Sequence, residues 1–288
     1  MDIILKISQE LMCRQEQVAA AVKLIDEGCT IPFIARYRKE ATGSLNDEQL
    51  RTLDERLTYL RGLEDRKEKV LASIEEQGML TDELKKSILA AETLVAVEDL
   101  YRPYKPKRKT RATIAQSKGL TGLANIISLQ MTNKPIPEEA LAYVSEEKEV
   151  HSAEEAIAGA MDIIAESISD NAEYRTEIRS LTMDKGILMT TAKDPEAESV
   201  YEMYYDFSTP VRKMAGYRTL AINRGEKEKF LSVKIEAPVD EITGYLIRQV
   251  IVRDNPNTND ILRNTITDSY ERLIAPSIER DIRSSLTE

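Results

Sequence analysis

The chain has 288 residues, a hydrophobic fraction of 42%, a charged fraction of 31% and a formal net charge of −10 at pH 7. This composition is typical of a soluble globular protein with room for about one to three domains. No apolar run approaches the length of a membrane span, and the first residues lack the basic region of a signal peptide. We therefore expect a cytoplasmic protein with no membrane partner. Helix-favouring residues abound and tryptophan is absent, which predicts a mostly α-helical fold.

The N-terminal residues predict a helix-turn-helix-like arrangement. Apolar spacing indicates short amphipathic helices over residues 2–11 and 14–27, and Pro32 can open a third, brief helix. The residues of this third helix that we expect in the core are Ile31, Phe33 and Ile34. A small basic cluster follows beside Tyr37, and its cations are Arg36, Arg38 and Lys39. The pattern alone is weak support for DNA binding.

One long central helix is predicted from Asn46 to about Gln77. Asn46 is a favourable N-cap, Gln49 can complete a capping box, and Gly78 can terminate the helix. Such a helix would be about 45 Å long. Its apolar stripe begins with Leu50, Leu53, Leu57 and Leu60. The positions that continue the stripe are Glu64, Lys67, Leu71 and Ile74. Because the seam drifts, we interpret this element as a scaffold helix rather than a dimeric coiled coil.

Shorter helices are predicted over residues 82–91 and 93–101, and several more follow. The helix after the N-cap Ser152 is apolar around most of its circumference, with Ile157, Met161 and Ile164 among its residues. Such a helix is expected to be central and buried.

The most unusual stretch is the basic segment, residues 101–111, which reads YRPYKPKRKTR. It contains no acid, and its six cations are Arg102, Lys105, Lys107, Arg108, Lys109 and Arg111. Subtracting these six from the 40 Lys and Arg leaves 34 cations against 50 Asp and Glu in the rest of the chain. Pro103 and Pro106 disfavour helical geometry, so we expect an extended segment between helices. Tyr101 and Tyr104 add aromatic faces of the kind found in grooves for single-stranded nucleic acid.

Two interpretations of the basic segment stay open. It is either a contact site for a polyanion or an internal clamp onto the protein's own acidic surface. In the first case its cations and tyrosines bind nucleic acid, together with the smaller cluster at Arg36, Arg38 and Lys39. In the second case the cations pair with carboxylates of this chain.

The residue pattern changes after Lys185, which divides the chain into predicted regions 1–185 and 186–288. Residues 186–192 suit a strand, and the alternation at Leu231, Val233 and Ile235 predicts a second one. The two can pair into a small antiparallel β element. Three tyrosines lie between them and are expected on helix faces, namely Tyr201, Tyr204 and Tyr205.

Residues 223–225 are expected to form a turn, and helices resume over 239–252 and 259–285. The last helix reaches Glu288 without a stop signal, which indicates part of a longer protein.

No pattern for catalysis or cofactor binding is found. His151 is the sole histidine, and the two cysteines, Cys13 and Cys29, lack metal-type spacing. Neither a phosphate-binding loop nor a dinucleotide fingerprint occurs. The loop 254–260 has calcium-like composition, but Pro256 stands at its third position and the required glycine is missing. We therefore predict a protein that is not an enzyme, with no catalytic residue, no metal and no cofactor.

Three separated segments resemble the Tex family of bacterial transcription accessory proteins. They are IPFIARYRKEATGSL (residues 31–45), EDLYRPYKPKRKTRATIAQSKGL (98–120) and AINRGEKEKFL (221–231). The resemblance implies a much longer protein, in which this N-terminal helical region precedes an RNase H-like domain, paired helix-hairpin-helix motifs and an OB-fold RNA-binding domain. It also implies a cytoplasmic role in transcription and binding of RNA or DNA, mainly through those absent C-terminal domains.

The leading hypothesis is a noncatalytic helical scaffold of a transcription accessory protein, associated with nucleic acid and the transcription machinery. The alternative is a protein-interaction module that docks on RNA polymerase or on the protein's own later domains. In that alternative the basic segment is paired internally. The family offers no catalytic residue to transfer to this region.

Overall fold

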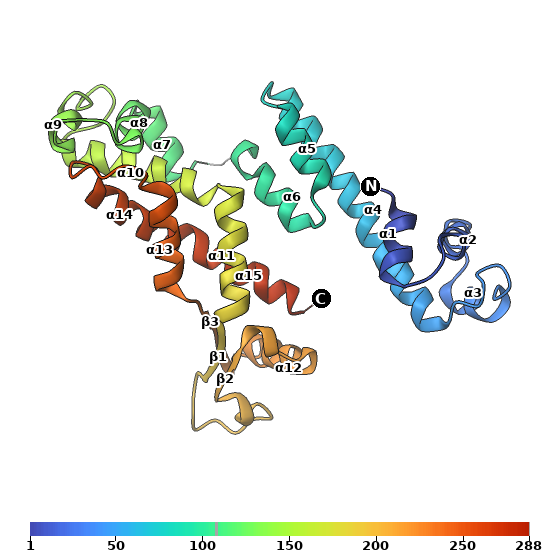
Figure 1. The fold of residues 1–288 in the computed structure, drawn as a ribbon. Helices are drawn as coiled ribbons and strands as arrows, with labels where there is room; N and C mark the ends of the chain where they lie inside the picture. The colour runs from blue at the N-terminus through green and yellow to red at the C-terminus, as the bar shows by residue number, and fades with distance from the viewer. Residues whose placement is uncertain (107–108, 288) are drawn as a thin grey trace. The chain divides into compact units, whose positions relative to one another are not determined.

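The computed structural model describes residues 1–106 and 109–287, which fall into two compact units, Met1–Tyr104 and Lys105–Glu288. Both units are mostly α-helical, and the second contains a small antiparallel sheet (Figure 1), which confirms the predicted fold class. The division predicted between residues 185 and 186 lies inside the second unit, where residues from both sides, such as Ile178 and Ile235, share one core. That domain division stays a prediction.

The first unit is built on the long helix α4. Its elements are α1 (Ile3–Glu10), α2 (Gln15–Asp26), α3 (Ile31–Tyr37), α4 (Asp47–Glu76), α5 (Asp82–Ala90), α6 (Leu94–Tyr101) and the 3₁₀ turn η1 (Arg102–Tyr104). Asn46 and Gln49 form the predicted capping box, and α4 ends just before Gly78, whose φ of 69° suits glycine. Every α-helix of this unit contacts α4. The three short N-terminal helices and the long central helix are therefore confirmed.

The buried face of α4 contains a lysine. After Leu60 the fully buried positions are Leu63, Lys67, Val70 and Ile74. The Lys67 ammonium donates to the backbone oxygen of Leu89 at 2.9 Å and forms an ion pair with Glu64 at 2.9 Å. Leu89 lies in the last turn of α5, where backbone carbonyls lack partners within the helix. Lys67 thus satisfies one end of α5 from inside the core.

The second unit packs its helices around α10. Its helices are α7 (Arg111–Ser117), α8 (Thr121–Leu129), α9 (Ile136–Leu141), α10 (Ala153–Ser169), α11 (Ala172–Lys185), α12 (Gly216–Lys227), α13 (Val239–Val250), α14 (Asn259–Asp268) and α15 (Ala275–Ser285). As predicted, α10 is central and contacts α7, α8, α9 and α14. Gly159 is required there, because a Cβ atom would lie 2.3 Å from Cδ1 of the buried Leu120. A six-residue π-helix, η4 (Ser269–Ile274), joins α14 to α15.

The sheet has three strands in the order β2-β1-β3. They are β1 (Ile187–Ala192), β2 (Asp206–Pro210) and β3 (Leu231–Glu236), and β1 pairs antiparallel with both neighbours. The predicted pair of strands is confirmed, and β2 is an addition to it.

Two local predictions in this region are wrong. Tyr201 and Tyr204 are buried, but they flank or end a 3₁₀ turn, η2 (Glu202–Tyr204), rather than a helix face. Asn223, Arg224 and Gly225 lie inside α12 and form no turn. The chain reverses later, at Lys229, which has a φ of 68°. No helix among the described residues is long and apolar enough to cross a membrane.

The role of Lys67 is testable by replacement with methionine, which keeps the length of the side chain and removes its charge. Lys67→Met deprives the part-buried Leu89 carbonyl of its donor and Glu64 of its partner, so we expect it to lower the free energy of unfolding by about 1–3 kcal/mol. Lys69→Met is the matched control, because Lys69 pairs with Asp65 on the exposed face of the same helix. The control should change stability by less than about 0.5 kcal/mol. Urea titration followed by circular dichroism measures both, and equal stabilities would contradict the assignment.

Candidate nucleic-acid interface

A surface of cations and aromatic rings covers α3, and we call residues Phe33, Arg36, Tyr37, Arg38 and Lys39 the α3 surface. Positions 33, 36 and 37 share one face of the helix, while Ile34 is fully buried on another. The exposed fractions of Phe33 and Tyr37 are 38% and 61%, and their ring centroids lie 5.3 Å apart. The Arg38 guanidinium carbon lies 5.4 Å from the centre of the Phe33 ring. The prediction that Phe33 belongs to the core is therefore wrong.

The loop after α3 is anchored to α2. The Gln17 side-chain amide donates to the backbone oxygen of Gly43 at 2.8 Å and to that of Thr42 at 3.3 Å. Gly43 has a φ of 58°, and a Cβ atom at this position would lie 2.8 Å from the Gln17 amide nitrogen. Residues 36–41 line a shallow depression of about 440 Å³. The hydrogen bonds from Gln17 thus hold the loop that follows the α3 surface against α2.

In the part of the chain that the structure describes, no carboxylate pairs with a cation of the α3 surface. Among the described residues, Arg36, Arg38 and Lys39 form no side-chain ion pair or hydrogen bond. Arginines of α4 differ, because they bridge to carboxylates of neighbouring helices. These bridges join Arg56 to Glu10 at 2.6 Å, Arg61 to Asp26 at 2.7 Å and Arg66 to Glu98 at 2.5 Å. The α3 cations remain available to an external anion.

The aromatic part of the basic segment is not an open stacking surface. Tyr101 is only 7% exposed, its hydroxyl lies 3.0 Å from the Ser73 hydroxyl, and Arg66 covers its ring. The prediction that Tyr101 offers a face to a base is therefore contradicted by its burial. Tyr104 is half-buried against the same core, and its backbone oxygen accepts a hydrogen bond from Gln77.

The cations of the basic segment lie in different surroundings. Arg102 is half-buried in η1, and both Arg102 and Lys105 interact with other groups. Lys109 is exposed and Arg111 opens α7, so the extended part is shorter than predicted. Lys107 and Arg108 lie outside the described residues.

Arg111 faces carboxylates of its own unit. It lines a pocket of about 570 Å³ between α7 and α10, together with Lys118 and Asp162. Burial raises the pKa of Asp162, and the charges of Arg272 and Arg111 act in the opposite direction. Hydrogen bonds from Arg272 lower the pKa of Asp268, and the charge of Arg111 lowers it further. Arg111 is itself exposed and forms no ion pair among the described residues, so its charge acts on these two carboxylates without direct pairing.

The structure does not bring the α3 surface and the start of the basic segment together within the first unit. The α3 surface precedes the first turn of α4, whereas Tyr104 meets Gln77 at its C-cap (Figure 1). A helix of 30 residues separates these points by about 45 Å. The sequence signal for the α3 surface is the helical spacing of Phe33, Arg36 and Tyr37, which predicts one shared face. The expectation that Phe33 lies in the core is incompatible with that face being exposed.

Few residues in the described parts of the chain are candidates for catalysis or metal binding. His151 is exposed and lines the pocket beside Arg111. Across residues 1–106 and 109–287, no group of three or more metal-ligating side chains comes together.

Replacing Arg111 tests whether its charge acts on the two carboxylates. Arg111→Gln should raise the pKa of Asp162 and of Asp268, because a removed positive charge disfavours the ionised carboxylate. Lys118→Gln is the control, since Lys118 lines the same pocket but donates to the backbone oxygen of Glu149. Titration of the carboxyl carbons by NMR reports both pKa values. Identical values in Arg111→Gln and the unaltered protein would show that this arginine projects elsewhere.

Two protein-family models match this chain. Residues 1–75 match the family model of the Tex-like protein N-terminal domain, and residues 131–288 match the Tex central region-like model. The α3 surface lies within the first match, and the basic segment lies between the two.

Individual relatives extend the match to nearly the whole chain. It is 48% identical to the uncharacterized protein YdcI of Bacillus subtilis over 98% of this chain and 40% of that protein. It is 39% identical to the transcriptional accessory protein Tex of Neisseria gonorrhoeae, over 100% of this chain and 39% of that protein. Human S1 RNA-binding domain-containing protein 1 is 29% identical over 93% of this chain and 28% of its own length. The chain thus spans about two fifths of these bacterial relatives, and it belongs to the Tex family.

Proposed function

We propose that this chain is a noncatalytic helical scaffold of a transcription accessory protein, and that it associates with nucleic acid through the α3 surface. The observation that carries the proposal is the set of three cations at the end of α3 and just after it, which form no ion pair among the described residues. The names of two relatives, a transcriptional accessory protein and an S1 RNA-binding domain protein, support the same class of role. We assign the protein to the cytoplasm and propose no cofactor.

The α3 surface suits a single strand. Arginine and lysine contact phosphates, and release of the counterions condensed on the strand makes such binding favourable at low salt. Exposed aromatic rings stack on bases without regard to sequence. Phe33 and Tyr37 supply the rings, and Arg38 already lies over one of them. Because the rest of the chain is acidic, a polyanion would be confined to such a surface.

The basic segment supplies a second contact in this proposal, through Lys109 and the cations that lie outside the described residues. The competing function is a protein-interaction module that docks on RNA polymerase or on the protein's own later domains, with the basic segment paired internally. The position of Arg111 near Asp162 and Asp268 favours this alternative at that one residue.

Neutralising the α3 cations tests the proposal. Arg36→Gln/Arg38→Gln/Lys39→Gln should weaken binding of single-stranded RNA or DNA by about tenfold or more at low salt. The slope of log affinity against log salt should fall by about 0.7 for each lost phosphate contact. Fluorescence anisotropy with a labelled oligonucleotide, repeated over a salt series, measures both quantities.

The matched control, Lys23→Gln/Arg51→Gln/Lys69→Gln, removes equal charge from cations that pair with carboxylates on the surface of the same unit. The control should keep both affinity and slope. Equal losses in the two variants would show that only overall charge matters. If neither variant loses affinity while Lys105→Glu/Lys109→Glu/Arg111→Glu does, the basic segment is the contact and the α3 surface is not.

The stacking part of the proposal has its own test. Tyr37→Ala should weaken binding by about 1–3 kcal/mol per stacked base and leave the salt slope unchanged, because no charge is lost. The same anisotropy series reports this result. An altered slope, or an unaltered affinity, would contradict stacking on Tyr37.

A further inference from the structure

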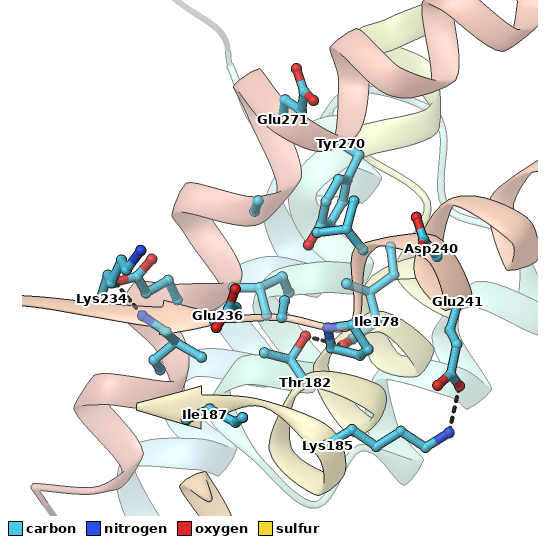
Figure 2. A pocket seen from close by; sticks show the side chains of 17 residues that line it. Ile178, Thr182, Lys185, Ile187, Lys234, Glu236, Asp240, Glu241, Tyr270 and Glu271 are labelled. Carbon is cyan, nitrogen blue, oxygen red and sulfur yellow. Dashed lines mark hydrogen bonds and ion pairs between the residues drawn. The ribbon is translucent and has the colours of Figure 1, made fainter. Parts of the chain in front are cut away.

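A groove of about 750 Å³ opens beside the sheet of the second unit (Figure 2). The end of α11, the end of β3 with its turn into α13, and the passage from η4 to α15 line this groove. Its apolar wall includes Ile178 and Ile278, both buried in the core of the unit. The groove contains none of the residues assigned above to nucleic-acid contact.

One side of the groove is a strand edge. β3 stands at the end of the sheet order, and the Lys193 amide donates to the Phe230 oxygen at 2.9 Å. In the antiparallel register this places the bonded pairs of β3 at Ser232, Lys234 and Glu236. Val233 and Ile235 therefore turn their backbone N–H and C=O groups away from β1. The Ile235 amide donates instead to the side chain of Glu279, at 3.3 Å from Oε1. The outward-facing amide of Ile235 is thus hydrogen-bonded to a side chain rather than to another strand.

The hydroxyl of a largely buried tyrosine points into the same groove. Tyr270, in the π-helix η4, is only 4% exposed, and its phenol oxygen is directed into the cavity in Figure 2. The described residues provide no hydrogen-bond partner for this oxygen, and it is not one of the buried polar atoms, so it is accessible from the groove. Burial raises the pKa of Tyr270, so the phenol stays protonated and is a donor at neutral pH. π-helical segments of this kind occur frequently at functional sites.

The charge of the groove is mainly negative. Its acidic residues are Glu236, Asp240, Glu241, Glu271 and Glu279, and its basic residues are Lys185 and Lys234. The negative charge of Glu241 is neutralised, because Lys185 pairs with it. Glu236, Asp240 and Glu271 are exposed. The groove therefore repels a nucleic acid and attracts a cation.

We propose that this groove binds an extended segment of a partner protein that carries lysine or arginine and adds as a strand to the edge of β3. Backbone groups of the segment would pair with Ile235, the outward-facing residue of β3 that lines the groove, as in other cases of strand addition. Glu279, released from the Ile235 amide, would then face a cationic side chain. The Tyr270 hydroxyl would donate to a carbonyl of the segment, which satisfies a group left without an acceptor.

A direct test uses a short capped peptide of alternating lysine and threonine, with a fluorescent label, and measures its anisotropy with the intact chain. A glutamate–threonine peptide tests charge, and a lysine–proline peptide lacks half of the backbone donors needed for pairing. We expect the lysine–threonine peptide to bind and the other two to bind about tenfold more weakly or worse. The groove variant Glu236→Gln/Glu271→Gln/Glu279→Gln should weaken its binding by about tenfold, and Tyr270→Phe by about threefold.

The matched control is Glu146→Gln/Glu196→Gln/Glu198→Gln, which removes equal charge from exposed positions of the same unit outside the groove. This control should bind like the unaltered chain. Equal affinity for the lysine–threonine and lysine–proline peptides would overturn strand addition, and equal losses in groove and control variants would overturn the site. Concentration-dependent dimers that the groove variant abolishes would identify a second copy as the occupant and overturn the proposal. These peptide-binding outcomes do not depend on whether the α3 surface binds an oligonucleotide.

Discussion

Burial of one face of α4 is the constraint on which the first unit depends. Its apolar side chains, from Leu50 to Ile74, form the line against which the other helices of the unit pack. The charged residues beside this line are then brought next to carboxylates of those helices. Arg56, Arg61 and Arg66 form inter-helix ion pairs as a result, and the hydrogen bond from Arg56 lowers the pKa of Glu10. Packing of the core thus decides which cations are neutralised.

The α3 surface follows from the same constraint. A helix of seven residues has room to bury only one narrow face, and α3 uses it for Ile34. Among the described residues, the cations beside its remaining face form no ion pair with a carboxylate. Arg36 in the last turn also complements the helix dipole, which stabilises the cation without neutralising it. A short helix at the edge of a scaffold is therefore where unpaired cations and exposed rings can persist together.

Local signals in the sequence predict most of the fold but only part of the site. Caps at Asn46 and Ser152 and the alternation in 231–235 act over a few residues, so they can be recognised without the fold. β2 escapes this reading because its sequence, DFSTP, contains aspartate, serine and proline and pairs only through the tertiary fold. The side of α3 that faces the core, and the burial of Tyr101 against Ser73, depend on distant residues. Burial of this kind cannot be predicted from the pattern of adjacent residues in the sequence.

The two surfaces proposed for recognition differ in sign, and this difference assigns them to different partners. The α3 surface carries unpaired cations in the first unit, while the groove beside β3 has excess carboxylates in the second. A nucleic acid is repelled by the groove, and a basic peptide is repelled by α3. The two also use different groups, since α3 offers side chains and β3 offers backbone donors and acceptors. In these two proposals, neither ligand competes for the charges or hydrogen bonds of the other.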